Sequence, residues 1–106
     1  MEKDNAELLR KFMPDTARAF ENLISATFKD GALSLKVKEL IAIGIAVSMR
    51  CNDCIDHHAV IAKELGATEK EIAEAMSVGF EMGIGSLYQA MMRSISKNFD
   101  AAQKQK

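Results

Sequence analysis

Apolar residues recur at intervals of three and four along the 106-residue chain, and no segment sustains the alternation of a half-buried strand. One proline and six glycines interrupt this pattern at few positions. The periodicity predicts an all-α fold of about five to six helices. We expect residues 1–106 to form a single compact domain, because a chain of this length builds one core.

The first thirty residues are expected to form two short helices. Asp4 is the predicted cap of a helix over residues 5–12, which ends near Met13 because the following proline disfavours helical geometry in the residue before it. Residues 15–29 carry the apolar stripe of a second helix, and the pair Asp30 and Gly31 supplies its stop.

A strongly apolar third helix is predicted over residues 35–50, with Ser34 as its N-cap. Its apolar residues leave almost no polar face, so the helix should be buried all round. A domain this small can hardly surround a helix by itself. We therefore expect part of its surface to pack against another subunit.

Two further segments complete the helical pattern. A fourth helix is expected to be capped around Asn52 and to run to about Leu65, with Gly66 after its end. Thr68 and Glu71 have the spacing of a capping box that opens a fifth helix. Residues 83–86, which hold two glycines, are expected to bend or break that helix before a last one. The predicted core face of the fifth helix is Ile72, Ala75, Met76, Gly79 and Phe80.

Charge and composition exclude several classes of partner. The net charge is −1, from 14 basic and 15 acidic residues, which gives no field for nucleic acid. The first residues are too charged for a signal peptide, and the longest apolar run, residues 40–49, is about half a membrane span. We therefore expect a cytoplasmic protein without a membrane partner. In a reducing compartment its two cysteines are expected to be redox-active or metal-binding rather than a permanent crosslink.

Both cysteines and both histidines lie within residues 51–58. On a helix, Cys51, Cys54 and His58 fall within roughly 60° of one another, whereas His57 turns about 100° away. Backbone N–H groups in the first turn of a helix stabilise a thiolate, and His58 is spaced to accept the thiol proton of Cys54. Two cysteines three residues apart can also close an intramolecular disulfide. The spacing therefore suits two-electron redox cycling.

Glu39 is a candidate partner of His58. It lies twelve residues before Cys51, at the edge of the apolar third helix. If the chain reverses after that helix, Glu39 can face His58, directly or through a water, and complete a proton path to the cysteines. The alternative is a first-turn carboxylate paired with Lys36 or Lys38. His57 is interpreted as a surface or subunit-contact residue.

The spacing of four residues matches a known motif without gaps: Glu39, Cys51, Cys54 and His58. It is the core motif of the AhpD-like alkylhydroperoxidase branch of the carboxymuconolactone decarboxylase family. The chain resembles this branch over about residues 34–85. The resemblance implies an all-helical AhpD-like fold, assembly as trimers or hexamers, and thiol-dependent peroxide reduction. It also implies that the two cysteines cycle between dithiol and disulfide while Glu39 and His58 relay protons. Asp53 stands where the better-known peroxidases have a histidine. Because an acid beside Cys54 opposes thiolate formation, disulfide exchange stays open beside peroxide reduction.

The expected partners are a peroxide or disulfide substrate and a protein or small-molecule thiol as electron donor, with no cofactor. We assign Cys54 as the attacking thiol and Cys51 as the exchange thiol, because His58 is spaced to activate Cys54. Two other functions stay open. One is a zinc-binding module that uses Cys51, Cys54 and His58 with another ligand. The other is a noncatalytic oligomeric scaffold.

Overall fold

The computed structural model describes residues 3–104, with side chains described for residues 6–99. The described chain is helical between short turns and has no strand, which confirms the all-α prediction. Two of the expected helices form one long helix, so five helices are present. They are Lys3–Phe12 (α1), Pro14–Thr27 (α2), Leu35–Ser48 (α3), Asn52–Glu64 (α4) and Glu69–Lys104 (α5).

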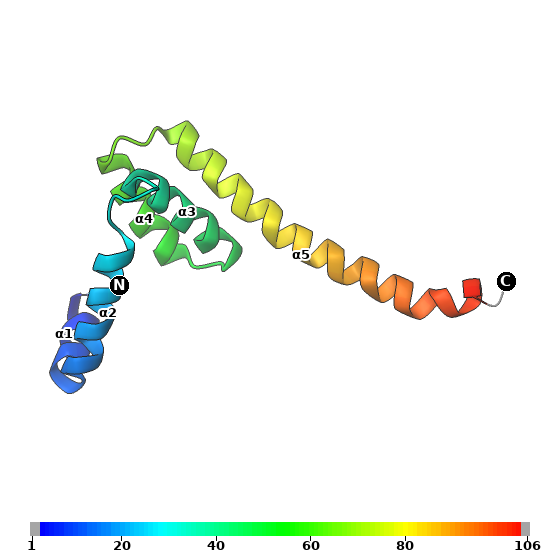
Figure 1. Cartoon of the computed structure of the whole chain (residues 1–106), viewed down its shortest axis with the longest axis horizontal. Coiled ribbons are helices and arrows are strands. Elements are labelled where there is room, and N and C mark those ends of the chain that lie inside the picture. The colour runs from blue at the N-terminus through cyan, green and yellow to red at the C-terminus, as the bar shows by residue number, and fades with distance from the viewer. Residues whose placement is uncertain (1–2, 105–106) are drawn as a thin grey trace.

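The helices divide into a packed body and two projections (Figure 1). α3 packs against α4 and against the first part of α5, and these three helices form the body. The α1–α2 hairpin projects from the body on one side, and the second half of α5 extends away on another. The chain therefore measures 65 × 37 × 26 Å. The core lies in the body and is built from Ile43, Ala62, Ala67 and Ile72.

Side-chain caps begin two of the helices at the predicted positions. Ser34 Oγ accepts the N–H of Val37 at 3.1 Å and caps α3. Thr68 and Glu71 form the expected capping box, because Glu71 Oε1 accepts the N–H of Thr68 at 2.8 Å and Thr68 Oγ1 accepts the N–H of Glu71 at 3.0 Å. Pro14 begins α2, one residue before the predicted apolar stripe, and its fixed φ suits the first turn of a helix. The prediction that Asp4 caps the first helix is wrong, because α1 already begins at Lys3.

The expected break in α5 is wrong. Figure 1 shows α5 as one helix that continues through residues 83–86, and its 36 residues extend over about 54 Å. Each glycine weakens a helix by about 1 kcal/mol relative to alanine but does not forbid helical geometry. The position of Phe80 is a second correction. Its side chain is 63% exposed, because the part of α5 that packs on the body ends near Gly79.

The crossing of α3 and α5 depends on two glycines. A Cβ atom on Gly79 would lie 1.9 Å from the carbonyl oxygen of Gly44, and one on Gly44 would lie 3.0 Å from the carbonyl oxygen of Ala75. The two backbones can approach this closely because neither glycine has a side chain. Since α3 also carries Glu39, this crossing fixes where that carboxylate lies in the body.

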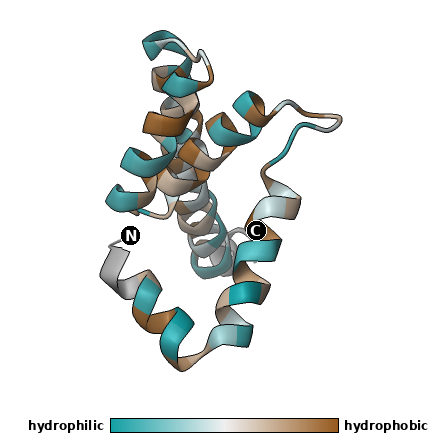
Figure 2. Ribbon diagram, turned by 90° about the vertical axis from the view of Figure 1, so that its left-hand side faces the viewer, coloured by the Kyte–Doolittle hydropathy of each residue, from teal (hydrophilic) through white to brown (hydrophobic). Residues whose placement is uncertain are grey.

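α3 is not buried all round within the chain. Glu39, Ile43 and Ala46 are buried, whereas Ile41 is 47% exposed and Ile45 is 53% exposed. The hairpin also exposes large apolar side chains, and Figure 2 shows hydrophobic residues between hydrophilic ones along it. The expected contact of α3 with another subunit stays a prediction. No helix within the described residues is long and apolar enough to cross a membrane.

Candidate thiol-disulfide site

A tight reversal after α3 places the two cysteines. Arg50 adopts a left-handed backbone conformation with φ 58°. Its N–H donates to the carbonyl of Val47, and the N–H of Cys51 donates to the carbonyl of Ala46, both at 3.0 Å. This bond pattern ends a helix and usually has glycine at the left-handed position, as Gly66 shows after α4. The reversal sets α4 beside α3.

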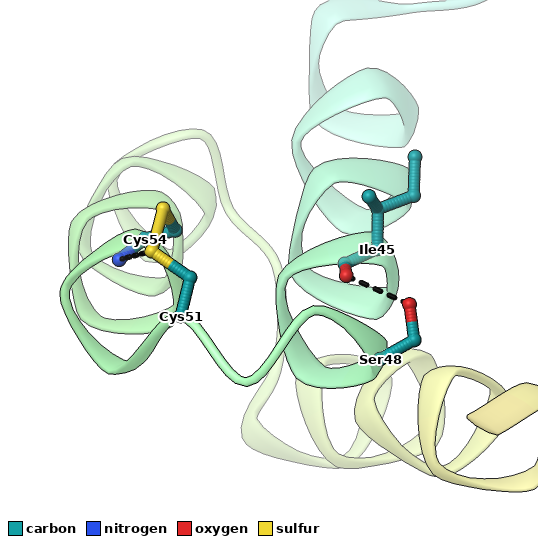
Figure 3. The surroundings of a disulfide bond; sticks show 4 residues. All are labelled: Ile45, Ser48, Cys51 and Cys54. Carbon is teal, nitrogen blue, oxygen red and sulfur yellow. Dashed lines mark hydrogen bonds between the residues drawn. A yellow bond between two sulfur atoms is a disulfide. The ribbon is translucent and has the colours of Figure 1, made fainter. Parts of the chain in front are cut away.

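The helix of the CxxC motif begins at the first cysteine. Cys51 is the N-cap of α4, and its Sγ accepts the N–H of Cys54 at 3.3 Å, so the predicted cap at Asn52 is one residue too late. Cys51 and Cys54 are joined by a disulfide bond at the start of α4, beside the end of α3 (Figure 3). The oxidised form of the motif is therefore compatible with the first turn of the helix.

Glu39 and His58 meet as the sequence analysis expects. Glu39 Oε1 lies 2.6 Å from His58 Nδ1, and Glu39 is only 3% exposed. A carboxylate can only accept a hydrogen bond, so Nδ1–H donates and Nε2 is the free acceptor of the neutral ring. The alternative partners of Glu39 are engaged elsewhere. Lys36 pairs with Glu71 at 3.1 Å, and Lys38 donates to backbone carbonyls.

Phe28 is a site residue that the sequence analysis missed. Its ring stacks on the His58 ring with centroids 5.5 Å apart and planes 21° apart. The sequence pattern placed Phe28 in the apolar stripe of the second helix. Phe28 and His58 are thirty residues apart in the sequence, and no local pattern indicates that they are in contact. The ring of His57 lies edge-on to His58 at 4.9 Å. His57 itself is exposed, as expected for a surface residue.

An open groove of about 570 Å³ runs along the exposed face of α3 and ends at the cysteine motif. Its walls are largely apolar, and both Cys54 and His58 line it, whereas Cys51 does not. A molecule in the groove can therefore reach one sulfur and the imidazole together. The apolar wall includes Phe28, Ile41, Ile45 and Met49.

The zinc alternative needs three ligand side chains to converge. Within the described part of the chain, no three histidine, cysteine, aspartate or glutamate side chains are grouped so that they could hold a metal ion. The two sulfurs are bonded to each other, and His58 Nδ1 faces Glu39. A single chain whose cysteines are joined in a disulfide therefore does not provide the predicted zinc site.

The fold and the site together define an all-helical protein with a CxxC disulfide at the start of a helix. The sequence matches the model of the carboxymuconolactone decarboxylase family over residues 14–94, and the chain belongs to that family.

Relatives of the chain occur in several bacteria. An uncharacterised protein of Cupriavidus necator is 38% identical over 77 residues, which cover 73% of this chain and 68% of the relative. Uncharacterised protein 4 in the cox locus of Paracoccus denitrificans is 41% identical over 70 residues, which cover 66% of this chain and 63% of the relative. The chain thus spans about two thirds of the length of these relatives.

Two solved structures of family members resemble the fold. A family protein from Legionella pneumophila has a TM-score of 0.72 at 38% identity, with 82% of this chain and 80% of that chain covered. A family protein from Thermotoga maritima has a TM-score of 0.68 at 30% identity, with 91% and 90% covered. A role in the antioxidative response has been suggested for the Thermotoga protein.

Proposed function

We propose that this protein is a thiol-dependent oxidoreductase that reduces a peroxide or a disulfide through Cys51 and Cys54. The observation that carries the proposal is the position of Cys54. It is disulfide-bonded to Cys51 and lines the same groove as His58, whose ring is held by the buried Glu39. A thiol, its proton acceptor and its resolving thiol are thus available in one place.

With a peroxide as oxidant, the reduced Cys54 thiol gives its proton to His58 Nε2 and the thiolate attacks one peroxide oxygen. A sulfur–oxygen bond forms, the oxygen–oxygen bond breaks, and the leaving alkoxide takes the proton back from His58 as an alcohol. Cys54 is then a sulfenic acid. The Cys51 thiol attacks this sulfur, a disulfide forms, and water leaves with the proton of Cys51.

The cycle is completed by an external dithiol. One donor thiolate attacks Cys51, which lies outside the groove, and the Cys51–Cys54 bond breaks with Cys54 as the leaving thiolate. His58 passes to Cys54 the proton that the donor thiol released on becoming a thiolate. The second donor thiol then attacks the donor sulfur of the mixed disulfide, and Cys51 leaves with the proton of that second thiol. The donor is oxidised to its own disulfide, and the enzyme regains both thiols.

Disulfide exchange uses the same residues when a disulfide replaces the peroxide. Asp53 lies exposed in the first turn of α4, where a carboxylate interacts favourably with the N-terminal helix dipole. Its negative charge beside Cys54 disfavours a thiolate. The charge opposes thiolate formation in both reactions, and disulfide exchange is kept as the second candidate because the Cys51–Cys54 disulfide is itself the group that exchanges with a thiol. The suggested antioxidative role of the Thermotoga relative is compatible with either substrate.

Single-cysteine variants test the assignment of the attacking thiol. In Cys51→Ser, one equivalent of peroxide should leave a sulfenic acid on Cys54 that a dimedone probe traps, because no resolving thiol is present. In Cys54→Ser, the trapped product should be much reduced. Trapping in Cys54→Ser alone would reverse the assignment, and equal trapping in both variants would refute it. Mass spectrometry of the labelled peptide identifies the modified cysteine.

We also propose that the chain assembles with further copies of itself, with trimers or hexamers as the forms that the family resemblance implies. Its accessible surface is 8466 Å², whereas a compact monomer of 11.7 kDa exposes about 5,900 Å². The excess of about 2,600 Å² is larger than the roughly 800 Å² that one partner contributes to a standard interface. Large apolar side chains, such as Leu23 at 60% and Leu87 at 66% exposed, account for part of it.

Sedimentation at micromolar concentration tests this assembly. The wild-type chain should sediment as an oligomer, and Leu23→Glu or Leu87→Glu should shift it toward the monomer because a carboxylate is costly to bury. Asn22→Glu and Gln89→Glu introduce the same charge next to each site, on exposed polar positions, and serve as controls. A wild-type monomer under these conditions would refute the proposal.

A further inference from the structure

The α1–α2 hairpin reaches the redox site through its last residues only. Among the described residues, α1 and α2 pack on each other and make no helix contact with α3, α4 or α5. Phe28 follows α2 as its C-cap, and its ring lies on His58. The position of this ring therefore depends on what holds residues 27–29 against the body.

Lys38 makes that connection from α3. Its Nζ donates to the carbonyl of Thr27 at 2.9 Å and to the carbonyl of Lys29 at 2.8 Å. These two carbonyls flank Phe28 on either side, so a single ammonium group holds the backbone of the residue between them. Hydrogen bonds from a charged donor are shorter and stronger than those between neutral groups.

Two contacts hold the His58 ring, and the first is the hydrogen bond that its Nδ1–H donates to Glu39. The bond holds the Nδ1 edge of the imidazole, and a contact on the face of the ring restrains it further. The Phe28 ring lies nearly parallel to the imidazole, at an interplanar angle of 21°, and makes this second contact. Contacts from two different elements thus hold the edge and one face of the ring.

We propose that Lys38 is a positioning residue of the redox site. By binding the carbonyls of Thr27 and Lys29 it holds Phe28 on His58, and the stacked Phe28 directs Nε2 of His58 toward the Cys54 sulfur in the groove. The contacts from Lys38 through Phe28 to His58 exist whatever reaction the protein catalyses. Their effect on turnover rests on the proposed function. The test therefore has one structural and one kinetic measurement.

The structural measurement is the NMR shift of the His58 ring protons in the oxidised protein. A stacked phenyl ring moves these protons upfield, and Phe28→Leu should remove that displacement. Lys38→Met should remove most of it as well, although it leaves Phe28 in the sequence. Lys38→Arg, which keeps a charged donor, should retain more of it than Lys38→Met. A His57→Gln variant assigns the resonance, because the chain has two histidines.

Lys36→Met is the matched control for this measurement. Lys36 lies two residues earlier on α3 and pairs with Glu71, so its loss should leave the His58 shift unchanged. The methyl resonances of the buried Ile43 report whether each variant keeps its core. A wild-type His58 shift in a folded Lys38→Met protein would overturn the inference, as would an equal change in Lys36→Met.

Turnover with a dithiol donor is the kinetic measurement. Lys38→Met should lower kcat several-fold with little change in KM, because a misoriented imidazole slows proton transfer more than binding. Unchanged kcat together with a lost ring displacement would overturn the catalytic part of the inference. If the wild-type protein has no turnover with any donor, the proposed function fails, and the NMR result still decides whether Lys38 positions Phe28.

Discussion

Replacing Gly79 by alanine is expected to disrupt the crossing of α3 and α5 that fixes Glu39 in the body. The added methyl group would lie 1.9 Å from the Gly44 carbonyl oxygen and 2.7 Å from its carbonyl carbon. Both are backbone atoms, so no side-chain rotation can relieve the contact. The helices must separate by more than about 1 Å to reach ordinary van der Waals distances.

The magnitude follows from two opposing effects. Overpacking a well-packed contact costs about 1–3 kcal/mol, and a rigid backbone contact belongs at the upper end of that range. Alanine in place of glycine within a helix contributes about 1 kcal/mol of stability. The expected net loss in Gly79→Ala is therefore about 2 kcal/mol. Ile43 and Ile72 lie in the core beside this crossing, so its separation also loosens their packing.

Gly83→Ala is the matched control, since it makes the same chemical change one turn later in α5. A Cβ atom on Gly83 meets no atom within 4 Å. This variant should therefore gain about 1 kcal/mol from helix propensity alone. Urea denaturation at one protein concentration should separate the two variants by about 3 kcal/mol in the free energy of unfolding. A Gly79→Ala protein that is as stable as Gly83→Ala would refute the close approach of α3 and α5.

Two further predictions concern the reversal after α3 and the start of α5. Arg50→Gly should raise the free energy of unfolding by about 1 kcal/mol in urea denaturation, because Arg50 has a left-handed conformation that glycine adopts freely; a loss of stability would contradict that conformation. The backbone N–H of Thr68 and the ammonium of Lys36 lower the pKa of Glu71 below its ordinary value. A lowered folded-state pKa stabilises the fold above the unfolded pKa of about 4.3 and ceases to do so as pH falls through the folded value. Glu71→Gln should therefore be less stable than wild type near pH 7, and the difference in Tm should shrink as the pH is lowered below about 4.3; a difference that stays constant as the pH falls would contradict the charged contact.

Local signals in the sequence predicted some of the helix boundaries. Ser34, Gly66 and the capping box at Thr68 act within one turn, so their effect can be read without the fold. The contact between Glu39 and His58 was also expected, because motif spacing and a reversal between two helices bring them together. Their catalytic roles and that of the cysteines stay predictions.

Other features depend on tertiary contacts that the local pattern does not contain. The weak helix propensity of Gly83 and Gly85 suggested a break, but the surrounding residues favour the helix enough to continue it. Phe28 looked like one more residue of an apolar stripe, although its ring lies on His58. Arg50 occupies a left-handed position where the sequence offers no glycine to indicate it. These positions are determined by the contact between elements rather than by either element alone.

The most direct test of the redox assignment is dithiol-dependent turnover of peroxide and disulfide substrates by the wild-type protein and single-site variants. Cys51→Ser, Cys54→Ser, His58→Gln and Glu39→Gln should each lose most of the activity, because the four residues act as a unit. Ser48→Ala is the control, since the exposed Ser48 lies at the end of α3, next to the helix that carries the disulfide, and donates to the carbonyl of Ile45 in its own helix (Figure 3). Our account predicts activity in the wild type and in Ser48→Ala, with a common loss in the four variants. Wild-type activity that persists in Cys54→Ser would contradict it.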